Sequence, residues 1–361
     1  MGRPHFVADL VFEILDNDDH WWPRDLARLA VVSSEWLWPV RKLLYRRPVI
    51  RTFAECALLG RALEGTPELR ALVRGIDLQP CGASSLAPDA KVMAALRRIL
   101  TLESLEAVTL GGALAVEAER FLMMLAGHAT GVKELSIIGA PLCDSVSPAS
   151  VAASLEWDTA RACALPNLER LRLSNLSLDI EFPYESIESR LRELVLDNVT
   201  IENGFLPHLI QESAPDFKHL SILTKEREQY DEQVRLVLEA YELESLQYDV
   251  DEQDPSEEEI FGADLPPHSS LRSLSLRGMK VCPDMLSAIS ESCPNLDELF
   301  VQGRSVCLSP EQWATFIASG ALPNLKCLGL PWSTYPPFRH WTKTCSDCIE
   351  TASAQRDIRL H

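Results

Sequence analysis

Cysteine and histidine residues near the end of the sequence are the side chains best suited to chemistry. Cys345 and Cys348 form a CxxC pair flanked by His340 and His361, so the four could bind zinc, or the two thiols could form a redox pair. A structural zinc site needs a second ligand pair at set spacing, and a redox CxxC follows a strand in a βαβ unit. Residues 342–355 instead have the pattern of an outer helix with both cysteines on its buried side. We therefore expect no metal or cofactor there.

A second concentration of polar side chains is acidic. Seven carboxylates lie between Asp249 and Glu259, but this run lacks the glycine and the glutamate spacing of a calcium loop. Its charge density is typical of a solvated loop, which we expect near residues 249–264. The sequence contains no GxxxxGK[ST], HExxH or GxSxG motif. The sequence therefore gives no support for a phosphate-binding loop, a zinc protease or a serine hydrolase. We do not expect the protein to be an enzyme.

The overall charge excludes one large class of partner. The 361 residues include 34 basic and 53 acidic side chains, a net charge of -19 at pH 7, which disfavours binding to the phosphates of nucleic acids. No stretch reaches the roughly 18 apolar residues of a membrane-spanning helix, and the pattern of a secretory signal is missing. We therefore expect no membrane partner. The protein should be cytoplasmic or nuclear, with its ten cysteines reduced.

The first 51 residues differ from the rest in charge and in aromatic content. They carry eight basic and seven acidic side chains, and they contain four of the eight tryptophans. Their apolar residues recur at helical spacing in three short runs, with Asp25 placed to cap the second run. The sequence predicts a three-helix module over residues 1–51 and a second region over residues 52–361.

Leucines recur in the second region in the pattern LxxLxL. Ten copies are recognisable, and their middle anchors run from Ile76 to Leu328 with a mean period of 28 residues. This period is typical of leucine-rich repeats with a strand and an outer helix in each copy. The clearest copies begin at Leu168, Leu191, Leu271, Leu296 and Leu325. The predicted fold is an α/β solenoid, a horseshoe of parallel inner strands and outer helices.

Two local patterns predict how the last copies are built. Ser309, Pro310 and Gly320 mark the start and the end of one outer helix, because serine caps, proline suits the first helical position and glycine allows a left-handed turn. At the end of the sequence, Ile358 and Leu360 alternate with charged residues. This alternation predicts one more parallel strand.

The N-terminal runs FVADLVFEIL, DLARLAVVSSEW and LLYRRPVI resemble the F-box-like motif that precedes leucine-rich repeats in many fungal proteins. The resemblance implies that these helices dock on a Skp-type adaptor, which links the chain to a cullin ubiquitin ligase, while the repeats hold a protein substrate. The residues expected to bind the adaptor, from this match and from helical spacing, are Leu10, Ile14, Leu26, Leu29, Val32 and Trp36.

The strand residues between the anchors form the expected substrate surface, because a curved sheet presents them to one partner. Charges of both signs alternate along this face, and arginine and large aromatic residues dominate binding hot spots. The residues expected to bind substrate are Arg170, Arg172, Glu193, Asp197, Arg277, Phe300, Arg304, Trp332 and Tyr335. Two alternatives stay open at this point: a repeat scaffold whose N-terminal helices only cap the array, and a thiol or zinc protein that uses the CxxC pair.

Overall fold

The computed structural model places most of the chain in two compact units, Met1–Ile138 and Gly139–His361. The described residues are 8–16, 21–80, 89–128, 130–140, 152–182, 190–210, 213, 215–225, 227–251, 260–261, 266–303, 306–331 and 343–361. Most of the acidic run is therefore outside them. Among the described helices, none combines the length and the apolar character needed to cross a membrane.

Three helices open the first unit: α1 (Ala8–Asp16), α2 (Pro23–Leu29) and α3 (Ser34–Arg46). They bury a small core of their own, made of Val11, Leu15, Leu26 and Val40. A core this small contributes little stability by itself, so partly buried aromatic and aliphatic side chains packed around it are needed to support it. The partly buried residues packed against it are Trp21, Leu29, Ala30, Trp36, Leu43 and Leu44.

The start of α2 differs from the prediction. The helix begins at Pro23, so Asp25 lies inside its first turn, where it forms an ion pair with Arg28 at 3.6 Å. The prediction that Asp25 caps this helix is wrong, because Pro23 suits the first helical position and moves the helix start upstream. An acidic residue in the first turn still interacts favourably with the helix dipole.

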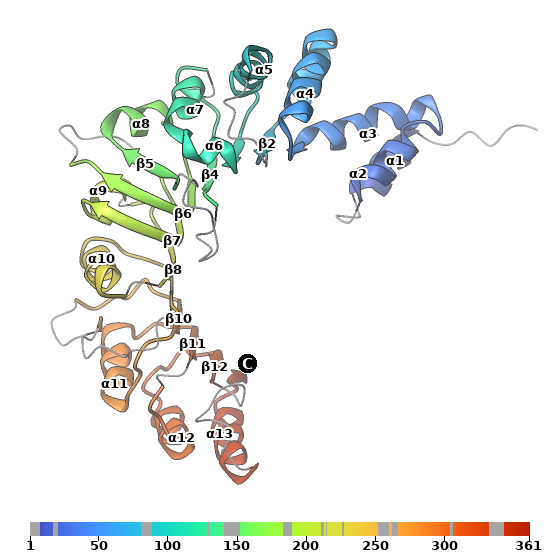
Figure 1. Ribbon diagram of the computed structural model, residues 1–361. Helices are drawn as coiled ribbons and strands as arrows, with labels where there is room; N and C mark the ends of the chain where they lie inside the picture. Colours follow the sequence, from blue (N-terminus) through green and yellow to red (C-terminus); the bar gives the residue numbers. More distant parts are fainter. Residues whose placement is uncertain are drawn as a thin grey trace, which may run out of the picture. The chain divides into compact units, whose positions relative to one another are not determined.

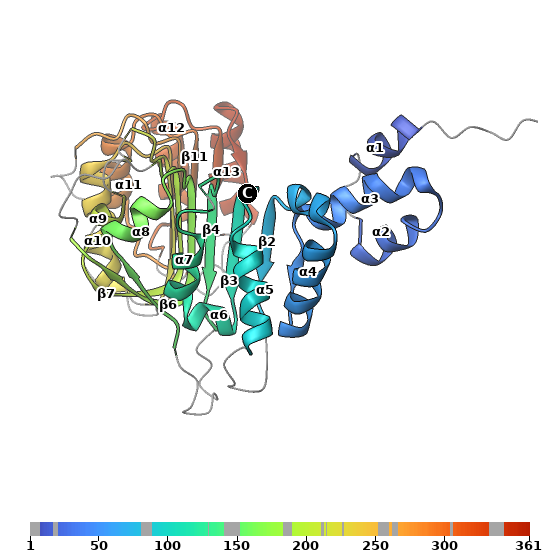
Figure 2. The ribbon, with the colours of Figure 1, turned by 90° about the horizontal axis from the view of Figure 1, so that it is seen from above.

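The rest of the first unit alternates strands with helices. In chain order its elements are β1 (Val49–Ile50), α4 (Phe53–Gly65), the 3-10 helix η1 (Pro67–Leu72), β2 (Gly75–Leu78), α5 (Ala90–Leu100), β3 (Ala107–Gly111), α6 (Ala113–Val116), α7 (Ala118–Leu125) and β4 (Glu134–Ile138). The strands pair in parallel in the order β1-β2-β3-β4. Figure 2 shows α4 and α5 beside β2 and β3, as expected for outer helices.

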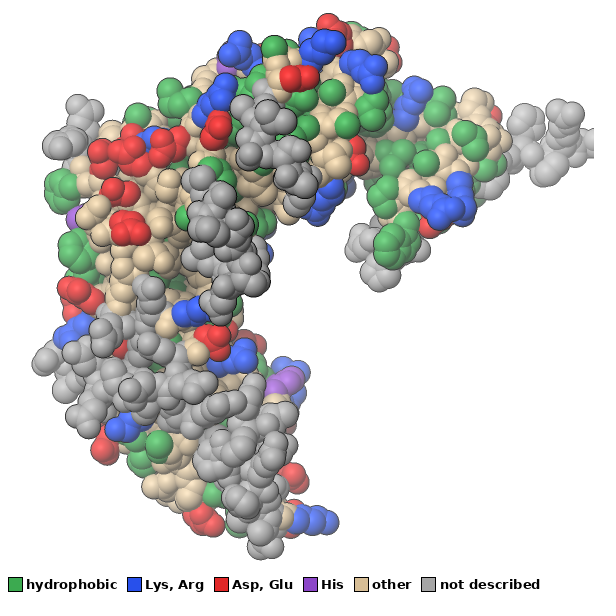
Figure 3. All heavy atoms as spheres, viewed as in Figure 1, with side chains coloured by type: hydrophobic (Ala, Val, Ile, Leu, Met, Phe, Trp, Pro, Cys, Tyr) green, Lys and Arg blue, Asp and Glu red, His purple; other side chains and the backbone are tan. Residues whose placement is uncertain are grey.

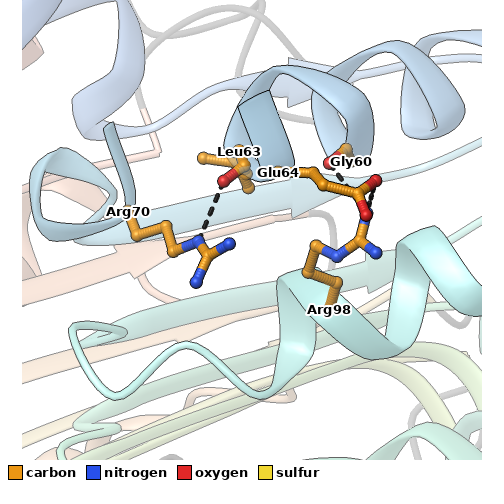
Figure 4. A network of polar contacts seen from close by, with 5 residues as sticks. All are labelled: Gly60, Leu63, Glu64, Arg70 and Arg98. Atoms are coloured by element: carbon orange, nitrogen blue, oxygen red, sulfur yellow. Dashed lines mark hydrogen bonds and ion pairs between the residues drawn. The ribbon is translucent and has the colours of Figure 1, made fainter. Parts of the chain in front are cut away.

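Two arginines connect the end of α4 to its neighbours (Figure 4). Arg98 Nη1 of α5 donates to the carbonyl oxygen of Gly60 at 3.1 Å and to Glu64 at 2.8 Å, and Arg70 Nε of η1 donates to the carbonyl oxygen of Leu63 at 2.9 Å. The last carbonyl groups of a helix have no partner within the helix and carry partial negative charge. The bond from Arg70 therefore satisfies one of these last carbonyl groups, and the bonds from Arg98 hold α4 against α5.

The second unit continues the same alternation (Figure 1). Its elements are β5 (Ser154–Trp157), α8 (Thr159–Ala164), β6 (Arg170–Ile180), β7 (Glu193–Asn203), α9 (Leu206–Ile210), β8 (His219–Thr224), α10 (Arg227–Ala240), β9 (Ser245–Val250), β10 (Ser273–Arg277), α11 (Pro283–Ser292), β11 (Glu298–Gln302), α12 (Pro310–Ser319), β12 (Cys327–Gly329), α13 (Lys343–Gln355) and β13 (Arg359–Leu360). Strands β6 to β13 pair in sequence order, and β5 pairs with β6, all in parallel.

The repeat anchors form the core, as the leucine pattern predicts. In the second unit Leu171, Leu194, Leu220, Leu246 and Leu274 lie opposite one another on successive strands, and each is at most 1% exposed. Burying one such side chain contributes roughly 1.5–3 kcal/mol. A shift of one residue on any strand would turn its anchors toward solvent, so the leucine spacing fixes the register. The parallel leucine-rich-repeat architecture is confirmed.

The chain changes direction at the eighth position of the repeat, counted from its first leucine. Five copies have a positive φ there, at Gly112, Asn175, Asn198, Gly278 and Gly303, which are residue types that tolerate this region. Space is restricted as well. A Cβ on Gly278 would lie 1.9 Å from the carbonyl oxygen of Val250, the eighth residue of the preceding copy. Neighbouring copies therefore pack backbone against backbone at this corner.

Both local predictions for the last copies are confirmed. Ser309 and Gln312 form a reciprocal capping box, Pro310 is the first residue of α12, and Gly320 ends the helix with φ 73°. At the end of the chain, β13 pairs in parallel with β12, with Leu360 opposite Leu328.

Candidate interaction surfaces

The six residues expected to bind an adaptor divide into buried and exposed groups. Leu26 is only 6% exposed and belongs to the core of the three helices, and Leu29 and Trp36 are packed against that core. The other three, Leu10, Ile14 and Val32, are exposed. The expectation for Leu26 is corrected, because its side chain stabilises the helices from inside. Helical spacing predicts an apolar face on a helix, but it does not predict whether the other helices of the module bury that face.

Three further large apolar residues are exposed in the same three-helix module. Val31, at the turn between α2 and α3, is 84% exposed, Trp22 is 74% exposed, and Trp38 is also exposed. Helical spacing alone does not mark these residues for binding, although the high tryptophan content of the segment is a signal of exposed aromatic surface. We define the module surface as Leu10, Ile14, Trp22, Val31, Val32 and Trp38. Exposed apolar residues concentrated in so short a segment are typical of a binding site.

The segment after α3 covers the first edge of the sheet in the first unit. Strand β1 pairs with β2, and the pairing extends upstream, where Arg74 N donates to Arg46 O at 2.9 Å and Asp77 N donates to Pro48 O at 3.0 Å. Helices α1 and α2 pack against α3. The open edge of β2 is therefore satisfied by residues 46–50, without a direct hydrogen bond from α1 or α2 in the described residues.

Charged residues expected to bind substrate come together on β6 and β7. Arg170 lies opposite Glu193, with Nε 4.0 Å from Oε2, and Ser174 lies opposite Asp197. Arg170 and Arg172 are exposed, while Glu193 and Asp197 are half-buried. An exposed ion pair of this length contributes little to stability. These side chains therefore remain available to a partner.

An aromatic residue and another arginine mark the other end of the same face. Arg277 lies opposite Asp249. Phe300 lies opposite Gly329, and a Cβ on that glycine would be 2.2 Å from the phenylalanine ring, so the ring covers the glycine. The ring centroid of His361 is 6.1 Å from that of Phe300. The lack of a side chain at Gly329 thus leaves space for the Phe300 ring on the strand face near β12.

The expected substrate residues share a face as far as the structure describes them. Arg304, Trp332 and Tyr335 lie outside the described residues. Following the strand register from Arg172 leads to Phe300 five strands away in the same row. Strands are spaced about 4.8 Å apart, so a partner that contacts both residues must span roughly 24 Å.

The CxxC pair lies on α13, as the sequence predicts, but one of its cysteines is not buried. Cys348 is exposed, and the buried side of this helix is formed by Ile349 and Ala352. The expectation that Cys348 faces the core is therefore wrong, because the helix is rotated relative to the simple one-turn pattern. His340 is outside the described residues.

One cluster of carboxylates resembles a cation site. Ligand atoms of Glu156, Asp158 and Glu181 lie within 4.8 Å of one another. Arg161 forms ion pairs with Asp158 at 2.5 Å and with Glu156 at 3.5 Å. The guanidinium thus already supplies the positive charge that two of these carboxylates need, and the cluster does not support a metal centre.

The thiols give a direct test of the packing. Burial raises the pKa of Cys56 to about 11 and that of Cys293 to about 12. Because the thiolate is the reactive form, we expect iodoacetamide at pH 8 to label the exposed Cys163 and Cys348 in the native protein and to label Cys56 and Cys293 only after denaturation. Peptide mass spectrometry measures the order. Native labelling of Cys293 as fast as that of Cys348 would contradict this packing.

Comparison with solved structures finds a likeness to a bacterial repeat protein. The crystal structure of LegL7, a leucine-rich repeat-containing protein from Legionella pneumophila, is similar with a TM-score of 0.44 and 14% sequence identity, over 87% of this chain and 88% of that one. No protein-family model and no curated protein sequence matches the chain. The leucine-rich-repeat fold of this chain rests on its own leucine spacing and strand register.

Proposed function

We propose that this chain is a substrate-recognition subunit of a cullin-type ubiquitin ligase. In this proposal the three N-terminal helices form an F-box-like module that docks on a Skp-type adaptor, and the strand face of the repeats binds a protein substrate. Such a subunit acts in the cytoplasm or nucleus and has no catalytic activity of its own. The observation that supports it best is the module surface.

The module surface exceeds what a cap of the array requires. The three helices already bury Leu26 with its neighbours, and β1 already covers the side of β2 that β3 leaves open. Val31 and Trp22 nevertheless stay largely exposed. Moving a side chain of this size from water into an apolar interface contributes roughly 1.5–3 kcal/mol. An adaptor with an apolar groove would therefore gain affinity from these residues.

The adaptor test uses the most exposed pair of residues. We expect the full chain with Val31→Asp and Val32→Asp to lose at least about tenfold in affinity for a purified Skp-type adaptor, because two carboxylates would be desolvated against an apolar partner. Isothermal titration calorimetry measures the loss. Leu26 is unsuited to this test, because a charge there would disrupt the core of the helices.

A matched control replaces two exposed apolar residues elsewhere in the first unit. Leu58 of α4 and Met123 of α7 are exposed, so Leu58→Asp with Met123→Asp adds the same charge and should leave adaptor affinity within about twofold. If the wild-type chain does not bind the adaptor, or if both double variants bind equally well, the ligase proposal is wrong.

A repeat scaffold without ligase association is the second candidate. It is favoured by the backbone bonds that join residues 46–48 to β2, because terminal elements of repeat arrays commonly cap the core. In that case deletion of residues 1–33 would leave partner binding by the repeats unchanged, and no adaptor would copurify with the full chain.

A further inference from the structure

Two exposed phenylalanines and a histidine form an aromatic patch on the second unit. Phe182 follows the end of β6, Phe205 precedes α9, and His208 belongs to α9. Phe182 is 66% exposed and Phe205 is 39% exposed. Their ring centroids are 4.8 Å and 5.7 Å from that of His208, and both contacts are edge to face. We call these three residues the aromatic patch.

The length of two neighbouring strands brings the aromatic patch together. β6 and β7 pair from their first residues up to Asp179, where a register shift places Asp179 opposite Asn203. The next residue, Gly204, has φ 85°, and a Cβ there would lie 2.1 Å from the carbonyl oxygen of Ile180. This close approach requires glycine. It sets the backbone before Phe205 directly against the end of β6.

Carboxylates border the aromatic patch. Glu181 and Glu202 are exposed near the ends of β6 and β7, and neither has a cationic partner among the ion pairs of the described residues. Glu156 and Asp158 lie beside Glu181, and Arg161 forms ion pairs with both of them. Figure 3 shows acidic side chains gathered over β5, β6 and β7. The border therefore carries a local excess of negative charge.

We propose that the aromatic patch and its acidic border dock a partner protein segment that carries lysine or arginine beside large apolar residues. The rings offer apolar area and π-faces that attract cations, and the carboxylates supply the opposite charge. The second unit as a whole has 18 basic and 36 acidic residues, which repels an acidic segment at long range. The negative charge and the aromatic rings thus both favour a basic segment that also carries large apolar residues.

This docking surface is separate from the expected substrate face. Phe182 follows Arg172 by ten residues, which is roughly 30 Å of extended chain. Asn175 lies between them with φ 52°, so the strand turns before it reaches the aromatic patch. The inference does not depend on adaptor binding.

The test uses a random 12-residue peptide library displayed on phage, selected against the full chain. We expect the enriched peptides to combine lysine or arginine with leucine, phenylalanine or tryptophan. Two enriched peptides are then synthesised with a fluorescent label, and fluorescence anisotropy measures their affinity. We expect Phe182→Ser with Phe205→Ser to weaken binding at least about tenfold and Glu181→Lys with Glu202→Lys at least about fivefold.

A matched control separates local docking from attraction to the acidic chain. Glu291 of α11 and Glu350 of α13 are exposed, so Glu291→Lys with Glu350→Lys changes the net charge equally and should leave affinity within about twofold. Circular dichroism confirms that each variant is folded. Enrichment of acidic or uncharged peptides, no enrichment, or equal binding by all folded variants would overturn the proposal.

Discussion

Replacing Trp313 with alanine is expected to lower the free energy of unfolding by about 3–5 kcal/mol. Trp313 is fully buried in α12, and its ring centroid lies 6.3 Å from that of Phe316. Removing an indole from such a site leaves a cavity that the surrounding side chains fill only in part. For a unit of this size, calorimetry should show a fall in Tm of roughly 10 °C.

Replacing Trp313 with phenylalanine separates the contribution of side-chain volume to stability from the contribution of the indole N–H. The indole N–H of Trp313 is buried and meets no acceptor among the described residues. Trp313→Phe keeps an aromatic ring and removes an unsatisfied donor, so we expect it to cost less than half of the alanine substitution. An unchanged Tm in Trp313→Ala would mean that α12 does not pack on the second unit as described.

Replacing Gly278 with alanine is the second large expected effect, about 3 kcal/mol or more. The substitution combines a left-handed backbone with a Cβ placed 1.9 Å from the carbonyl oxygen of Val250. Backbone cannot move aside as a flexible side chain can. The stacked corner between the two copies would have to open.

Gly320 provides the matched control in the same unit. Its φ of 73° is close to the 77° of Gly278, but a Cβ there would meet nothing within 4 Å. Gly320→Ala should therefore show only the cost of the left-handed conformation, about 1 kcal/mol. Urea unfolding of both variants measures the difference. Equal losses would show that the corner has room for a side chain.

Features repeated along the chain could be predicted from the sequence. The leucine spacing gave the register because each anchor must be buried by a neighbouring copy. The cap of α12 and strand β13 followed from short local patterns, Ser309 with Gly320 and Ile358 with Leu360, whose physical causes lie within a few residues.

Features that depend on three-dimensional packing could not be predicted in the same way. Leu26 and Val32 are both apolar and lie near each other in the sequence, yet the first is buried and the second exposed, because α2 ends at Leu29 and Val32 lies in the turn before α3. The extension of β6 and β7 past Asn175 and Asn198 was also missed, since both residues resemble strand ends in sequence.

The same distinction between repeated local patterns and three-dimensional packing applies to the candidate binding sites. Arg172 and Phe300 could be assigned to one face because alternate strand residues share a side of the sheet. Phe182, Phe205 and His208 could not be linked, because no spacing rule connects the end of one strand with the helix after the next strand. The pairing of Asp179 with Asn203 brings them together.

The parallel order of the strands has a consequence for how the protein loses structure. From β7 to β13, each described strand hydrogen-bonds only to the strands that come directly before and after it in the sequence. Such an array can open from an end without disturbing distant copies, because each interface it breaks is local. Amide protons of β13, at the last position, should exchange with solvent well before those of β8 and β9, whose neighbours on both sides must separate first. Loss of structure in this unit is therefore graded along the chain, so a protease that cleaves locally open states should cut the C-terminal copies first.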